Sequence, residues 1–285
     1  MKRKLLNRSA LDQHPLPPIV DGDKESKGRL LVIAGSREVP GAALLTATAA
    51  MRAGAGKLRI ATVESAAPYL GLAMPEAMVV GLPESADGGF SAAAKKRIDA
   101  LASAADAIVA GPGVKPNGEC AAIASSLLET RAALALDVAF LETLPNPTTK
   151  RQSLPILLPN ADELTSLLGC DAKDVEANPV ECGRAAAERY NAVVLVKGVA
   201  SHVVTADGNA WRYDGGAPGL GVSGSGDVLA GIVGGLLARG AEPLNALLWA
   251  VWLHGEAGAA LAKKIGPIGF LAREITDEIP PLLLR

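Results

Sequence analysis

Aromatic residues are scarce in this sequence: Phe, Trp and Tyr together make up only 3% of its 285 residues. A core of ordinary size must therefore be built from Ala, Leu, Val and Ile, and the 31 glycines let backbones approach closely. An excess of either charge is also absent, because the formal net charge is -2. Binding to nucleic-acid phosphates requires a concentrated Lys/Arg face, so we expect no nucleic-acid partner.

Cysteine is rare as well, and the spacing of the three cysteines is not that of a zinc or dithiol site. We expect all three to be reduced thiols in a cytoplasmic protein: Cys120, Cys170 and Cys182. The basic N-terminus lacks the apolar stretch of a signal peptide. The apolar run 228–238 is bounded by Asp227 and Arg239 and is too short to span a bilayer, so we expect no membrane association.

Short apolar, β-branched runs alternate with longer Ala/Leu-rich stretches. The runs predict strands at 29–35, 57–62, 77–82, 107–113, 133–138, 155–160 and 192–198. This alternation indicates βαβ units, hence an α/β fold of three layers with a mostly parallel central sheet and helices on both faces. Residues 201–216 predict a hairpin, and helices are expected at 224–239, 243–264 and 269–283. We expect one domain over 1–285, with 1–27 as an N-terminal arm or loop.

The stretch GVSGSGD, residues 221–227, places a lone Asp where a glycine-rich loop becomes a helix. Gly224, Ser225 and Gly226 can turn tightly and, with the helix N-terminus, form an anion site. Asp227 would then accept the proton of a hydroxyl held against a bound phosphate. An equally simple reading is that Asp227 is only the N-cap of the helix.

Three other strand ends carry polar residues or glycine. Asn160 and Glu163 predict a reciprocal capping box, or alternatively a substrate contact and a carboxylate that holds hydrated Mg2+. Lys197 ends an apolar strand, where its ammonium either reaches an anion or extends to solvent. Gly113 is expected in a strand-end turn that a substrate could approach. No Gly-Lys-Ser/Thr nucleotide loop is present.

One histidine lies among small residues of an expected helix. We predict that His254 is packed and hydrogen-bonded rather than catalytic.

The order of these motifs resembles that of the ribokinase-like superfamily, and the details resemble its NAD(P)H-hydrate dehydratases over nearly the whole chain. The stretch KGRLLVIAGSREVPGAALLTATAAMRAGAGKLRIAT is the most specific to that branch, whereas GSGD is shared with sugar and vitamin kinases. Nothing in the chain resembles the epimerase domain that is fused to some members. The resemblance therefore implies a stand-alone dehydratase.

The resemblance also implies roles for individual residues. Ala42, Gly113, Asn160 and Asp227 would contact the hydrated nicotinamide nucleotide, with Asp227 as the base and Glu163 near Mg2+, through water. The adenine nucleotide would be held by Lys197, Gly198, Val199, Ala200, Ser201, Gly224, Ser225 and Gly226. One departure is that Asn160 stands where the dehydratases usually have His.

The implied activity is the repair of hydrated NADH or NADPH at the expense of ADP or ATP, by phosphorylation of the ring hydroxyl and loss of phosphate. A homotetramer is expected from the resemblance and from the apolar late helices. Two alternatives stay open: a small-molecule kinase of the same fold, favoured by the Asn-x-x-Glu element, and a nucleotide sensor without turnover, which would not need Asp227.

Overall fold

The structure is a computed structural model that describes residues 2–18, 21, 27–147 and 151–284. Over this part of the chain, ten strands form one sheet in the order β1-β10-β9-β8-β7-β6-β5-β2-β3-β4. Strand β9 is antiparallel to both of its neighbours, and every other pairing is parallel. The mostly parallel sheet expected from the sequence is therefore confirmed.

The strands are β1 (Lys2–Leu5), β2 (Arg29–Ile33), β3 (Lys57–Val63), β4 (Ala77–Leu82), β5 (Ala107–Ala110), β6 (Ala133–Leu136), β7 (Ile156–Leu157), β8 (Val193–Val196), β9 (Ser201–Thr205) and β10 (Asn209–Tyr213). The helices are α1 (Arg8–Leu11), α2 (Gly41–Arg52), α3 (Ala67–Ala73), α4 (Ala94–Ala102), α5 (Glu119–Leu128), α6 (Ala139–Glu142), α7 (Ala161–Leu168), α8 (Ala172–Ala177), α9 (Pro179–Tyr190), α10 (Ser225–Ala238), α11 (Pro243–Lys264), α12 (Ala272–Ile275) and α13 (Ile279–Leu283). Two 3-10 helices are η1 (Pro218–Leu220) and η2 (Thr276–Glu278).

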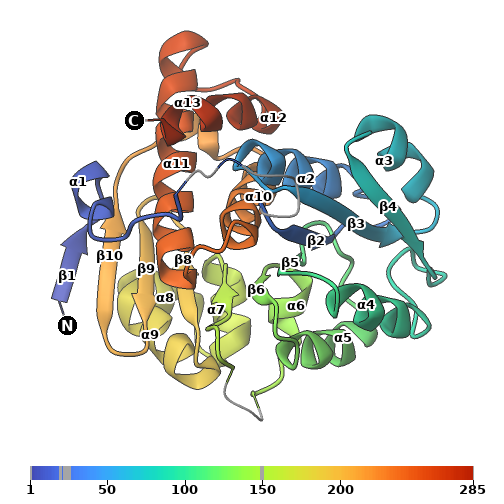
Figure 1. Ribbon diagram of the computed structural model, residues 1–285. Helices are drawn as coiled ribbons and strands as arrows, with labels where there is room; N and C mark the ends of the chain where they lie inside the picture. Colours follow the sequence, from blue (N-terminus) through green and yellow to red (C-terminus); the bar gives the residue numbers. More distant parts are fainter. Residues whose placement is uncertain (1, 19–20, 22–26, 148–150, 285) are drawn as a thin grey trace.

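Strand β2 shows how one apolar run serves two cores. Its side chains alternate, so that Leu30 and Val32 belong to the apolar cluster beneath α2, α10 and α11. Leu31 and Ile33 belong to the cluster beneath α4, α5 and α9 on the other face. A strand that is buried on both faces reads as a continuous apolar run, and Figure 1 shows the resulting three layers.

Helices α2 and α10 pack so closely that two positions of α10 leave no room for a side chain. A methyl group added at Gly231 would lie 2.2 Å from the carbonyl oxygen of Thr46, and one at Gly235 would lie 2.4 Å from that of Ala50. The Thr46 hydroxyl donates a hydrogen bond of 3.1 Å to the carbonyl oxygen of Asp227. The α2 contact therefore fixes the first turn of α10, where the predicted anion site lies.

The seven strands predicted from apolar runs are all present, and so is the hairpin, which turns at Gly208 with a φ of 82°. The expected helix at 269–283 is instead divided into α12, η2 and α13. Pro280 and Pro281 cause the break, because proline fits only the first turn of a helix.

The N-terminal segment is more ordered than the arm or loop that the sequence suggested. Residues 2–5 form β1, which pairs with β10 and extends the sheet by one strand. Leu6 and Leu11 are buried in the core beneath α11.

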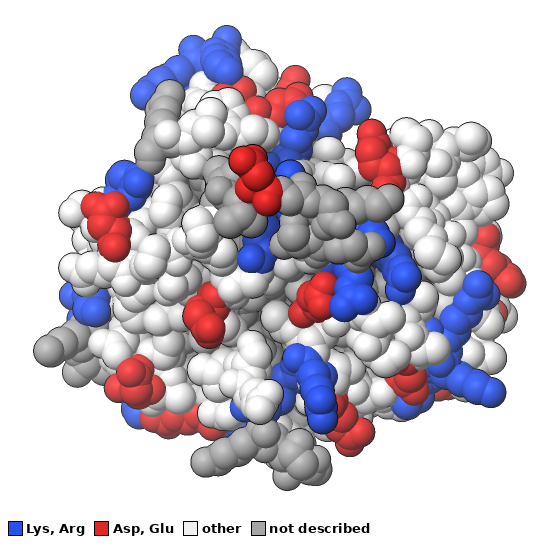
Figure 2. Space-filling view, viewed as in Figure 1, with Lys and Arg blue, Asp and Glu red and all other residues white. Residues whose placement is uncertain are grey.

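The face of the molecule drawn in Figure 2 carries charges of both signs. On the face in Figure 2, Lys and Arg side chains are interspersed with Asp and Glu side chains. Among the described residues, no helix is both long and apolar enough to cross a membrane.

Candidate active site

The first turn of α10 lies at the carboxyl edge of the parallel strands. Gly224 is its N-cap and has a φ of 88°, a conformation that favours glycine. Because glycine has no side chain, this N-cap makes no side-chain capping hydrogen bond. Asp227 is therefore the third residue of the helix and not its cap, so the capping interpretation of this residue is wrong.

The Asp227 carboxylate is half-buried and, among the described residues, has no hydrogen-bond partner. Its pKa is raised to about 6, chiefly by burial and also by the Asp137 carboxylate, whereas the Lys197 ammonium acts to lower it. A carboxylate that titrates close to neutral pH and is free of partners can accept a proton from a substrate hydroxyl.

The amides of this turn are not all available to an anion. The Ser225 amide donates to the carbonyl oxygen of Val222, at 3.2 Å. In the described chain, the backbone amides of Gly226 and Asp227 donate no hydrogen bond. No atom lies within 4 Å of the place where a side chain of residue 226 would begin. The free donors of the predicted phosphate cradle are thus centred on Gly226 rather than on Ser225.

Ser225 is directed away from the edge of the sheet, toward α11. Its hydroxyl lies 3.0 Å from His254 Nε2, and its carbonyl oxygen lies 3.1 Å from the same nitrogen. A carbonyl only accepts, so Nε2 carries the hydrogen. Burial lowers the pKa of His254 to about 4. His254 is thus the packed, hydrogen-bonded histidine that the sequence predicted, and the Ser225 side chain is occupied by it.

Lys197 does not extend to solvent. Its Nζ lies 2.8 Å from Asp137 Oδ1 and 3.6 Å from Glu163 Oε2, and its side chain is 20% exposed. Burial alone would lower the pKa of Lys197, but the two carboxylates outweigh it and leave the pKa raised. The Lys197 ammonium thus links the ends of β6 and β8 to the first turn of α7. The expected contact with a nucleotide would have to be made in addition to these two ion pairs.

Asp137 is the residue that sequence reasoning missed. Its side chain is 2% exposed, and it directly follows β6 at the edge where the other site residues gather. The available signal was an acidic residue at the end of an apolar strand, which is rare unless a partner compensates the charge. That partner, Lys197, is distant in the sequence.

The Asn160–Glu163 element is a capping box. Asn160 Oδ1 accepts from the Glu163 amide, and Glu163 Oε2 accepts from the Asn160 amide, both at 2.8 Å. The capping interpretation is therefore confirmed. In the described part of the chain, no three His, Cys, Asp or Glu side chains form a group able to hold a metal ion.

Ala42 and Gly113 lie against each other. A methyl group at Gly113 would lie 2.4 Å from Ala42 Cβ and 2.9 Å from the Val39 carbonyl oxygen, and Gly113 has a φ of 63°. Packing and backbone conformation are enough to require this glycine. The structure thus brings together two residues that the resemblance assigned to the substrate.

The remaining predicted nucleotide residues lie in the loop between β8 and β9 and at the first position of β9. Gly198 and Val199 are exposed, whereas Ala200 and Ser201 are half-buried. The loop follows Lys197 and so begins at the same edge as Asp227.

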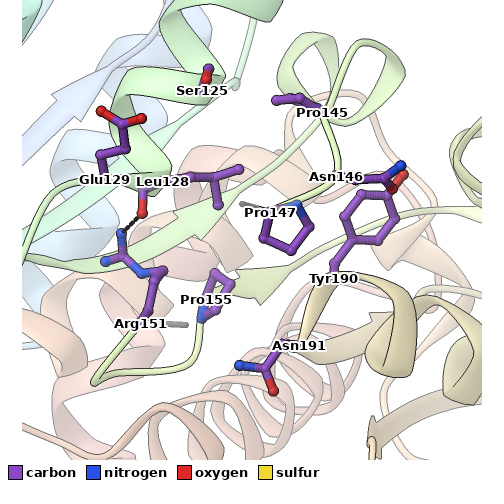
Figure 3. Close-up of a pocket in the computed structure, with 10 residues that line it drawn as sticks. All are labelled: Ser125, Leu128, Glu129, Pro145, Asn146, Pro147, Arg151, Pro155, Tyr190 and Asn191. Atoms are coloured by element: carbon purple, nitrogen blue, oxygen red, sulfur yellow. Dashed lines mark hydrogen bonds between the residues drawn. The ribbon is translucent and has the colours of Figure 1, made fainter. Parts of the chain in front are cut away.

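A pocket lies at the other edge of the sheet (Figure 3). Pro155 precedes β7 and Asn191 precedes β8, so this pocket is at the strands' amino ends. Its Arg151 donates to the carbonyl oxygens of Leu127 and Leu128, at 3.0 and 2.7 Å. Arg151 therefore stabilises the end of α5, and the pocket is not part of the site around Asp227.

Most of the chain matches one family of known proteins. Residues 30–281 match the sequence profile of a family described as NAD(P)H-hydrate dehydratase. The chain belongs to the NAD(P)H-hydrate dehydratase family. It is 44% identical to the ADP-dependent (S)-NAD(P)H-hydrate dehydratase of Xanthomonas campestris, over 99% of this chain and 96% of that protein.

Two solved structures resemble this dehydratase-family chain over nearly its full length. The ADP/ATP-dependent NAD(P)H-hydrate dehydratase of Bacillus subtilis, co-crystallised with ATP/Mg2+, has a TM-score of 0.88 at 27% identity, covering 99% of this chain and 98% of that chain. A ribokinase-like superfamily protein of Enterococcus faecalis has a TM-score of 0.84 at 23% identity, covering 99% of this chain and 95% of that one, and supports the ribokinase-like fold alone. The chain spans about half the length of the bifunctional NAD(P)H-hydrate repair enzymes that it matches.

Proposed function

We propose that the chain is an ADP-dependent (S)-NAD(P)H-hydrate dehydratase, which restores NADH or NADPH from its hydrated form. The observation that carries this function is the 44% identity over almost the whole of a protein with that name. The Asp227 carboxylate at the start of α10 has no hydrogen-bond partner among the described residues, and it supplies the group that such chemistry requires.

The reaction needs a better leaving group than hydroxide. Asp227 takes the proton of the ring hydroxyl while the hydroxyl oxygen attacks the terminal phosphorus of ADP. The products of this step are a phosphate ester of the ring and AMP. The lone pair of the ring nitrogen then expels phosphate, and loss of a ring proton restores the dihydropyridine. With ATP the nucleotide product would be ADP.

The roles of the site residues are part of the proposal. Above pH 6 the Asp227 carboxylate is ionised and ready to act as the base. The free amides of Gly226 and Asp227, with the positive end of α10, would stabilise the transferred phosphoryl group. Adenine-nucleotide contacts are assigned to Lys197–Ser201, and substrate contacts to Ala42, Gly113 and Asn160.

Glu163 fits a water-mediated contact with Mg2+. Its Oε2 is occupied by the Asn160 amide and Lys197, whereas no described residue bonds Oε1. Mg2+ keeps several waters and needs few carboxylates. When bound, it would neutralise charge on the nucleotide phosphates.

The function is tested by incubating the protein with the hydrate of NADH and, separately, of NADPH, each with ADP or ATP. Recovery of dihydronicotinamide absorbance with stoichiometric phosphate release is the expected result, and the four pairs give the substrate preferences. Asp227→Asn should lower turnover by about two to four orders of magnitude and leave nucleotide binding intact. A stable phosphorylated alcohol with no absorbance recovery would instead identify a small-molecule kinase.

A homotetramer and a cytoplasmic location complete the proposal. Both rest on the resemblance to the family. Light scattering of the purified protein tests the tetramer.

A further inference from the structure

An apolar side chain of α2 lies beside the carboxylate of Asp227. A methyl group added at Gly224 would lie 2.5 Å from Leu45 Cδ1 and 3.9 Å from Asp227 Oδ2. The Leu45 side chain and the Asp227 carboxylate therefore lie within 4 Å of one point. The same methyl group would lie 3.2 Å from Ala272 Cβ, at the start of α12. Leu45 and the start of α12 thus form apolar walls close to the carboxylate.

Leu45 also lies on the side of α2 that carries a proposed substrate contact. Residues three apart on a helix share a face, so Leu45 follows Ala42 along one side of α2. The next residue, Thr46, donates its hydrogen bond of 3.1 Å to the Asp227 carbonyl oxygen, where Figure 1 shows α2 and α10 side by side. The α2 wall of the site therefore runs from Ala42 through Leu45 to Asp227.

The Leu45 side chain is only half-buried, although it packs against the apolar cluster beneath α2, α10 and α11. Ligand sites commonly combine apolar walls with a few polar groups that fix the orientation of the ligand. The hydrated nicotinamide ring suits such a wall, because it has two broad faces of carbon and hydrogen and carries its hydroxyl on one ring carbon. A ring packed against Leu45 can present this hydroxyl to Asp227.

We propose that Leu45 is a substrate-contact residue, which packs against one face of the hydrated nicotinamide ring and so directs the ring hydroxyl to the Asp227 carboxylate. This inference rests on the proposed function, since it concerns the substrate of that reaction. The contact orients the reacting group and keeps water away from the base, and both effects favour transfer of the proton.

Leu44 is the matched control. It lies next to Leu45 in α2, is also half-buried and packs against the same apolar cluster. Its carbonyl oxygen accepts from Thr48 Oγ1, which lies 3.9 Å from Met74 Sδ at the end of α3. Leu44 is thus on the α3 side of the helix, and truncating it should cost stability without touching the substrate.

Steady-state kinetics with the hydrate of NADH test the contact. Leu45→Ala should lower kcat/KM for the hydrate roughly 10- to 50-fold, the scale of a lost apolar contact in a binding pocket. The KM for ADP should stay unchanged. Leu45→Met should keep most of the activity, because it retains the apolar volume. Leu44→Ala should change neither constant, and urea unfolding should show a similar loss of stability in both Ala variants.

The pH dependence of kcat gives a readout that a purely structural side chain would not change. Burial raises the pKa of Asp227 to about 6, with Asp137 acting in the same direction and Lys197 against it. Leu45→Ala admits water to the carboxylate and leaves both neighbouring charges in place. The acid limb of its profile should therefore move to lower pH, whereas that of Leu44→Ala should not.

The outcomes separate this inference from the proposed function. An active parent whose Leu45→Ala variant keeps its kcat/KM for the hydrate, or loses no more than Leu44→Ala, would overturn the role of Leu45 alone. A parent that restores no dihydronicotinamide absorbance with ADP or ATP would overturn the proposed function, and the role of Leu45 with it.

Discussion

Asp227 is held in the site at a cost to stability, because an ionised carboxylate there is desolvated and faces Asp137. Its pKa rises from 3.8 to about 6. A group with a raised folded-state pKa contributes stability below its unfolded pKa and loses it as the pH rises through the folded value. The penalty is therefore absent below pH 3.8 and complete above pH 6.

Asp227→Asn should remove this penalty. We expect the variant to be more stable than the parent by about 1–3 kcal/mol near pH 8, and equally stable near pH 4. Urea unfolding at the two pH values measures the difference. A gain of the same size at both would show that the charge of Asp227 is not its cause.

Lys197 is predicted to be structural as well as functional, because Asp137 depends on it. Lys197→Met should lower the free energy of unfolding by about 3–5 kcal/mol, since it leaves a buried carboxylate uncompensated. Adding Asp137→Asn should recover part of the loss, which a double-mutant cycle measures. The exposed pair of Arg3 and Glu181 is the control, and Arg3→Ala should have little effect. Independent, additive effects of the two changes would contradict the pairing.

Asn160 combines a cap with a proposed substrate contact, and the two can be separated. Asn160→Asp keeps the oxygen that accepts from Glu163, so stability should be retained. Asn160→Ala removes it and should cost about 1 kcal/mol. If the amide group also donates to the hydrate, both variants should raise the KM for the hydrate. An unchanged KM for Asn160→Asp would limit Asn160 to the capping box.

At the scale of the element, α10 uses its glycines for two purposes. Gly231→Ala should destabilise the protein by about 2 kcal/mol or more, because the added methyl group meets the Thr46 carbonyl oxygen. Gly226→Ala should leave stability unchanged, since nothing lies within 4 Å of the added group, yet it should weaken ADP binding by crowding the free amides.

Calorimetry with ADP and urea unfolding of both variants check this contrast. Gly41→Ala, at another open position in a helix, is the control for both measurements. If Gly226→Ala binds ADP with normal affinity, the phosphates of ADP do not lie against the first turn of α10.

At the scale of the molecule, β1 is the outermost strand at one edge of the sheet and covers β10. It pairs with β10 through residues 2–5, and Lys4 Nζ lies 4.9 Å from the Trp211 ring centroid. Removing residues 1–5 should expose the backbone of β10 and lower the unfolding temperature by roughly 3–6 °C. It should also promote association of chains through the open edge.

Calorimetry and size-exclusion chromatography at several protein concentrations measure both effects. Lys4→Ala, which keeps the backbone pairing, is the control and should change neither strongly. An unchanged unfolding temperature after the deletion would show that β1 adds no stability to the sheet.

The sequence by itself determined the features that depend on near neighbours. Apolar runs and their spacing predicted β2 to β8, the hairpin at Gly208 and helices α10 and α11, because these patterns follow from backbone geometry over a few residues. The same kind of evidence predicted the capping box at Asn160, the glycine turn before Asp227 and the packed His254. The order of the motifs was enough to indicate the family.

Only the tertiary structure decided which distant side chains meet. The sequence alone allows the Lys197 ammonium to face a nucleotide. In the structure, the end of β6 and the first turn of α7 place Asp137 and Glu163 beside it. Strand order and helix packing create these contacts, and burial and the neighbouring charges then shift the pKa of Lys197 in opposite directions. No local pattern records such pairings, because each side chain alone is compatible with solvent as well as with its partner.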